Sequence, residues 1–246
     1  CPWMVFPGKL RRNTYCGLCM ECLKTCPKDN IAINVRPFGS DLFVMEEHRL
    51  DEAFKAFIML SCALLYAAVL LGPWGWLKQW ANMDSLAHWG VYVAAFWSVN
   101  LLLVPGVFGV CAAVSRHISR LEVPLRQLFT DYAYACVPLG LAAWIAFSLS
   151  FVFVNGSYAL AVISDPFGWG WNLFGTANEP WTPILPGLVS FLQVGVLTIG
   201  LLFAVHTVYR ITTHYIPDRR RVFQAALPFV LPLTGITLLF LWLYLG

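Results

Sequence analysis

Long apolar runs separated by short polar connections dominate the chain from residue 53 onward. Five such runs occur: Ala53 to Leu71, His88 to Val114, Tyr132 to Val154, Pro186 to Tyr209, and Ala225 to Leu245. A helix rises about 1.5 Å per residue, so each run is long enough, or nearly so, to cross a hydrocarbon core of about 30 Å. The pattern therefore predicts an all-α polytopic membrane protein, with five transmembrane helices in residues 51–246 and the lipid bilayer around them.

Five residues within these runs stand out from the apolar pattern. Pro105 should kink the second helix, because proline removes a backbone N–H group and clashes with the preceding turn. Four polar residues should form hydrogen bonds between helices, as polar side chains inside a bilayer commonly do: Asn100, Ser98, Gln193 and Ser190.

Composition supports the membrane class and excludes others. Hydrophobic residues make up 59% of the 246 residues and charged residues 12%, which is too apolar for a water-soluble or a disordered chain. No Walker motif or glycine-rich dinucleotide fingerprint occurs. Nucleotide-driven pumps and dinucleotide-dependent dehydrogenases therefore have no support, and we expect no nucleic-acid partner.

The N-terminal residues carry a different signal, a tight group of cysteines. Cys16, Cys19, Cys22 and Cys26, with Pro27 after them, form the Cys-x2-Cys-x2-Cys-x3-Cys-Pro pattern that holds [4Fe-4S] clusters in bacterial ferredoxins. Structural zinc sites instead pair their cysteines in two separated knuckles, which disfavours zinc. Residues 1–50 are thus expected to form a ferredoxin-like iron–sulfur segment on a reducing, cytoplasmic face.

The number of available ligands gives a further prediction. In two-cluster ferredoxins the fourth cysteine of this motif ligates the other cluster. Cys16, Cys19 and Cys22 then need a remote cysteine followed by proline, which Cys1 provides. Cys26 would serve a second cluster, completed by residues upstream of position 1 or by a partner, so we expect one cluster or two. The alternative is that Cys1 is a spare thiol at the start of a sequence that we expect to continue upstream.

These features resemble a known family. The Cys1-Pro2-Trp3 segment, the motif from Cys16 to Pro27 and their coupling to transmembrane helices are similar to membrane-bound [4Fe-4S] polyferredoxins of the NapH/NosR type, a quinol dehydrogenase and reductase accessory family. The resemblance covers residues 1–50 only. It implies cytoplasmic clusters that exchange electrons with the quinone pool or redox partner subunits, in the inner membrane of a bacterium or archaeon. The family's usual upstream helices and Cys-x3-Cys-Pro element are absent, which leaves the partner and the direction of electron flow open.

Ionisable residues near the ends of two helices are further candidates. His206, Arg210 and His214 recur at every fourth position and share one face of the fourth helix, and His117 lies near the corresponding end of the second. Ionisable groups inside a membrane are costly and often functional. They could bind a quinone headgroup, or His117 could ligate a b-type haem together with His206 or His214. The alternative is that Arg210 and His214 are ordinary basic residues of a loop, and that His206 forms a hydrogen bond between helices.

The leading hypothesis is a membrane electron-transfer subunit. It would relay electrons through its cytoplasmic cluster or clusters, between the quinone pool or a cytoplasmic donor and redox partner subunits. The sequence leaves open whether it belongs to a quinol-linked oxidoreductase. The alternatives are a protein for iron–sulfur assembly or redox sensing, and a non-catalytic anchor of a larger complex.

The distribution of positive charge predicts the orientation of the helices. Every Lys and Arg except Lys78 lies in residues 1–55, 115–131 or 210–223, which an alternating five-span arrangement places on one side. By the positive-inside rule that side is cytoplasmic, so the N-terminus is inside and the C-terminus outside. A reporter fused after Gly246 should be periplasmic, and one inserted in residues 216–221 should be cytoplasmic. Cytoplasmic labelling at both positions would contradict the count of five spans.

Overall fold

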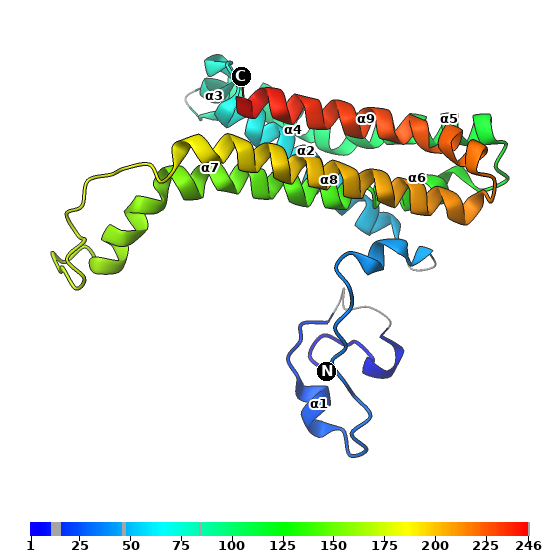
Figure 1. Cartoon of the computed structure of the whole chain (residues 1–246), viewed down its shortest axis with the longest axis horizontal. Helices are drawn as coiled ribbons and strands as arrows, with labels where there is room; N and C mark the ends of the chain where they lie inside the picture. Colours follow the sequence, from blue (N-terminus) through cyan, green and yellow to red (C-terminus); the bar gives the residue numbers. More distant parts are fainter. Residues whose placement is uncertain (11–15, 46–47, 84, 246) are drawn as a thin grey trace. The chain divides into compact units, whose positions relative to one another are not determined.

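The computed structural model describes residues 1–10, 16–45, 48–83 and 85–245 (Figure 1). The chain divides into two compact units, Cys1–Val44 and Met45–Gly246. All regular elements among the described residues are helical, and none of those residues forms a strand. The expected all-α class is therefore confirmed.

The first unit has little regular structure and almost no core. Its elements are two 3-10 turns and one short helix: Pro7–Lys9, α1 (Glu21–Thr25) and Ser40–Phe43. Among its described residues only Leu42 is buried. Small units without a sufficient core commonly depend on disulfides, metals or partners. Apolar packing therefore contributes little to its stability.

The second unit contains five segments that are long and apolar enough to span a membrane, as the sequence predicts. The described helices in it are α2 (Leu50–Leu71), α3 (Gly75–Ala81), α4 (Leu86–Ser98), α5 (Val104–Ser119), α6 (Leu125–Ala133), α7 (Cys136–Ser164), α8 (Pro186–Tyr215) and α9 (Arg219–Leu245). Continuous spans combine α4 with α5 and α6 with α7. The apolar run from Tyr132 to Val154 does not reveal most of α6, because polar residues interrupt the apolar pattern of that helix.

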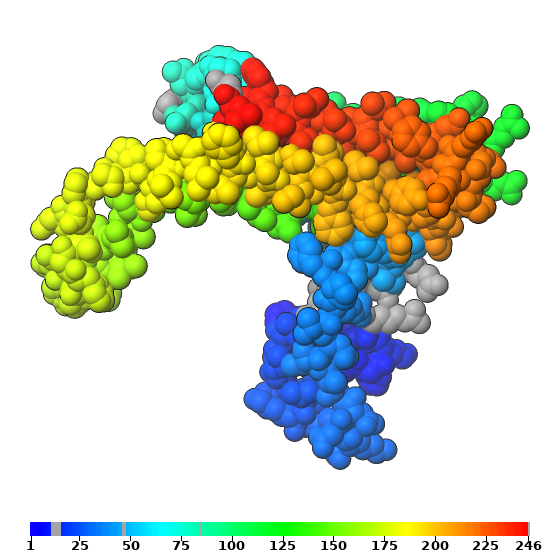
Figure 2. Space-filling view, in the orientation of Figure 1, coloured from blue at the N-terminus to red at the C-terminus, as the bar shows by residue number. Residues whose placement is uncertain are grey.

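The bundle packs around α7, α8 and α9. α8 lies against both α7 and α9, α2 lies against α7, and α5 lies against α9. Figure 2 shows the closely packed outer surfaces of α8 and α9. Inside, the ring of Tyr132 stacks on that of Phe229 with centroids 3.8 Å apart, and Phe108 packs between Phe229 and Phe57. Aromatic side chains therefore pack α2, α5, α6 and α9 against one another.

Two of the four polar side chains expected to connect helices do so, whereas the Ser98 hydroxyl donates to the Ala94 oxygen of its own helix at 2.7 Å. The Gln193 amide of α8 donates to the backbone oxygen of Ala146 at 2.9 Å and to Ser150 at 2.8 Å, both in α7. The Ser61 hydroxyl of α2 donates to Asn100 at 2.6 Å. Both Asn100 and Gln193 are buried, so these bonds replace water that hydrocarbon cannot supply.

The irregularity expected at Pro105 takes the form of a π-helical turn. This turn, Val99–Leu103, joins α4 to α5 and ends just before the proline. Pro105 has no N–H group for the Leu101 carbonyl, and a wider turn avoids the clash between that carbonyl and the proline ring. The Asn100 side chain donates to Phe96 at 2.8 Å within this stretch, so it stabilises the turn from inside.

A close approach between α7 and α8 depends on Gly200. A Cβ atom at this position would lie 2.3 Å from the Ala142 Cβ and 3.3 Å from the Pro138 oxygen, whereas one at Gly195 would meet nothing within 4 Å. Small residues allow such approaches between transmembrane helices.

Replacing Gly200 by alanine should therefore destabilise the bundle. Overpacking of this kind costs on the order of 1–3 kcal/mol, because the helices must move apart. Thermal unfolding of the purified protein in detergent measures the loss, and G195A on the same helix is the matched control. Equal stability of the two variants would contradict the close packing of α7 on α8.

Candidate functional site

The loop that carries Cys19 has an unusual backbone. Leu18 and Met20, on either side of Cys19, both have positive φ angles, 51° and 63°. L-residues with a side chain rarely adopt this conformation, and such strain gathers at functional sites. Left-handed residues also let successive backbone N–H groups form a concave anion site, which is common around iron–sulfur clusters. The local geometry therefore suits a negatively charged group bound at Cys19.

Four of the five N-terminal cysteines line one cavity. The cavity has a volume of about 600 Å³, and Cys1, Cys16, Cys19 and Cys22 are among its lining residues, whereas Cys26 is not. Most of the other lining side chains are apolar, with Arg36 and Asp41 as an ion pair at 2.8 Å. These are the same four thiols that the sequence assigns to one cluster. Their role as cluster ligands stays a prediction.

The side chain of Trp3 packs against Gly17 in the cysteine motif. A Cβ atom on Gly17 would lie 2.2 Å from Nε1 of Trp3, so the indole ring occupies the space that any side chain at position 17 would need. Gly17 directly follows Cys16. The contact therefore holds residues 1–3 beside the loop that carries Cys16 and Cys19.

The arrangement of the possible metal ligands bears on the kind of site that this unit could form. Among the described residues, no three His, Cys, Asp or Glu side chains come close enough to hold one metal ion. In a [4Fe-4S] cluster each thiolate binds a different iron atom, so the ligands must surround a volume. Cys1, Cys16, Cys19 and Cys22 line one cavity, and all eight cysteines of the chain are free thiols, so a cluster bound by these four stays a prediction.

Cys26 lies in a different environment. It ends α1 as the C-cap residue, and the backbone N–H groups of Asn30 and Lys28 lower the pKa of its thiol. These amides stabilise the thiolate, which is the form that binds iron. Cys26 therefore lies outside the cavity and loses its proton more readily than an ordinary cysteine, and its role as a metal ligand stays a prediction.

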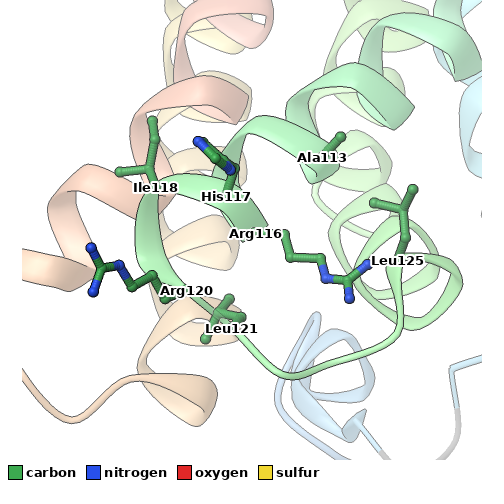
Figure 3. A pocket seen from close by; sticks show the side chains of 7 residues that line it. All are labelled: Ala113, Arg116, His117, Ile118, Arg120, Leu121 and Leu125. Carbon is green, nitrogen blue, oxygen red and sulfur yellow. The ribbon is translucent and has the colours of Figure 1, made fainter.

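Among the pockets that the described residues form, the one lined by His117 is not lined by the three ionisable candidates of α8. His206, Arg210 and His214 lie on the exposed face of α8, as their spacing predicts. His117 lies at the end of α5, in a surface pocket that none of these three residues lines (Figure 3). Their assignment to quinone or haem stays a prediction, without a shared cavity to support it.

The analysis of the sequence missed a buried polar network at the start of α2. The carboxylate of Asp131 in α6 contacts Nδ1 of His48 at 2.8 Å and accepts a hydrogen bond from the hydroxyl of Tyr215 at the end of α8. The side chains of His48 and Asp131 are 1% and 2% exposed. A lone acid next to an apolar run was the available signal, since Asp131 directly precedes the run that begins at Tyr132, whereas the helix itself begins at Leu125.

A second tyrosine extends this network. The rings of His48 and Tyr134 stack with centroids 3.8 Å apart, and the Tyr134 hydroxyl donates to Glu52 at 2.5 Å. With Nδ1 bonded to Asp131, Nε2 of His48 is buried and has no hydrogen-bond partner among the described residues. The network joins α2, α6 and α8 at one end of the bundle.

Comparison of the chain with protein-family models, with curated proteins and with solved structures found no match.

Replacing Asp131 by alanine should destabilise the bundle by about 1–3 kcal/mol, because His48 and Tyr215 both lose their buried acceptor. D131N, which keeps one acceptor oxygen, should lose less. Chemical unfolding in detergent, followed by circular dichroism, measures both. Loss of less than about 0.5 kcal/mol in D131A would contradict the network.

Proposed function

We propose that this chain is a membrane electron-transfer subunit that holds a [4Fe-4S] cluster through Cys1, Cys16, Cys19 and Cys22. The observation that carries the proposal is the cavity that these four thiols line together. The left-handed residues beside Cys19 support it, as does the near absence of a core among the described residues of positions 1–44. A bound cluster would supply one-electron transfer, and it would also stabilise a unit that apolar packing stabilises little.

The chain's own residues have separate tasks in this proposal. The cysteines supply soft thiolate ligands, and backbone N–H groups near Leu18 and Met20 offset the negative charge. Trp3 on Gly17 keeps Cys1 beside the motif. Cys26, whose thiolate is favoured by backbone hydrogen bonds, is left for a second cluster completed by cysteines outside this sequence.

The finer parts of the proposal rest on the sequence. The N-terminal unit lies on the cytoplasmic side of a bacterial or archaeal inner membrane, as the positive-inside rule predicts. Electrons pass between the quinone pool or a cytoplasmic donor and redox partner subunits. The five apolar helices support the membrane location.

Replacing Cys19 by serine should remove the cluster, because a cavity ligand is lost, and should leave the protein in the membrane, because the helices form a separate unit. The measurement is iron and acid-labile sulfide content, with low-temperature EPR after reduction. The unaltered chain should contain about four irons.

Two further variants sharpen this test. C26S should keep the cluster, since Cys26 does not line the cavity, and C111A in α5 should have no effect. G17V keeps every cysteine but displaces Trp3, so it should lower the cluster content. A full cluster signal in C19S, or its loss in C26S alone, would overturn the ligand assignment.

A further inference from the structure

The surface pocket at the end of α5 is strongly basic. It has a volume of about 690 Å³, and the side chains that line it come from α5, the loop after it and the first residue of α6: Ala113, Arg116, His117, Ile118, Arg120, Leu121 and Leu125. None of them is acidic, and Glu122 of the same loop does not line the pocket. The pocket therefore presents positive charge without an internal counterion.

The two arginines of the pocket lie on opposite sides of it. Figure 3 shows Arg116 extending toward Leu125 and Arg120 extending in the opposite direction. No ion pair that the structure shows among the described residues involves either of them. Arg221 of α9 adds a third cation nearby, since its guanidinium donates to the Ser119 oxygen at 2.7 Å.

Arg120 occupies a position that normally selects glycine. Its φ is 48°, and the N–H groups of Arg120 and Leu121 bond to the oxygens of His117 and Arg116, which closes α5 in a Schellman motif. Glycine is the usual residue at this left-handed site because a Cβ atom is strained there. Arg120 keeps a strained backbone where glycine would be relaxed, and its side chain lines the pocket. This indicates a function for the side chain.

An exposed apolar stripe leads into the pocket. Val110, Val114 and Ile118 follow one another at intervals of four residues on the same face of α5, and all three are exposed. Ile118 also lines the pocket. α5 completes a span that is long and apolar enough to cross a membrane, so this stripe faces lipid chains and the pocket lies where that span ends.

We propose that this pocket binds an anionic phospholipid. Arg120, which extends on the same side of α5 as Ile118 in Figure 3, holds the headgroup phosphate, and the acyl chains lie along Val110, Val114 and Ile118. Arg116 adds positive charge from the other side of the pocket. Guanidinium groups bind phosphate with two parallel hydrogen bonds, and basic pockets at membrane helix ends are typical sites for anionic lipids. The site requires only the membrane location and is independent of the iron–sulfur proposal.

The test measures lipid binding to the full chain in detergent, by native mass spectrometry with phosphatidylglycerol and phosphatidylcholine. Phosphatidylglycerol should bind more tightly. R120G should weaken its binding by about fivefold, R116Q should weaken it less, and both should leave phosphatidylcholine unchanged. R120G should not lose thermal stability, because glycine relieves the strain at position 120. The matched control is R219Q/R220Q, at exposed residues of α9 outside the pocket.

Each outcome decides the proposal. Loss of phosphatidylglycerol binding in the pocket variants but not in the control supports a specific lipid site. Equal loss in R219Q/R220Q would overturn it in favour of unspecific attraction to cations. Inorganic phosphate that displaces the lipid at similar concentration would also overturn it, because the site would then bind a free anion without using the apolar stripe.

Discussion

Hydrocarbon cannot hydrogen-bond to a backbone, and this constraint shapes the whole of residues 45–246. Each apolar run must satisfy its own N–H and C=O groups, so it becomes a helix. Where Pro105 removes a donor, the π-helical turn Val99–Leu103 accommodates the break, and Asn100 supplies hydrogen bonds within the protein. The side chains of Gln193 and Asp131 likewise find their hydrogen-bond partners within the protein.

The N-terminal unit cannot be explained by the same forces. Only Leu42 is buried among its described residues, and its helices are single turns or little longer. Its distinctive features are instead chemical: four thiols around one cavity, strained residues beside Cys19 and an indole fitted onto Gly17. These features are understandable together if the unit is organised by a group that it binds.

Apolar periodicity predicted the five spans because it reports burial directly, but it failed where polar residues enter a helix. α6 was missed since Arg126, Gln127 and Asp131 interrupt its apolar pattern, and the partner of Asp131, His48, lies 83 residues away. The shared face of His206 and His214 followed from helix geometry alone. That His117 lies in a separate basic pocket depends on how α5 ends, which spacing does not encode. The left-handed conformation of Arg120 likewise could not be predicted, because arginine usually favours a right-handed helix.

The central claim is that Cys1 joins Cys16, Cys19 and Cys22 around a single [4Fe-4S] cluster. The most direct test is the Mössbauer spectrum of the full chain, loaded with isotopically enriched iron, with and without the substitution C1A. The account predicts the spectrum of a four-iron cluster in the unaltered protein and its loss or conversion to a three-iron form in C1A. Mononuclear iron in the unaltered protein, or an unchanged four-iron spectrum in C1A, would contradict it.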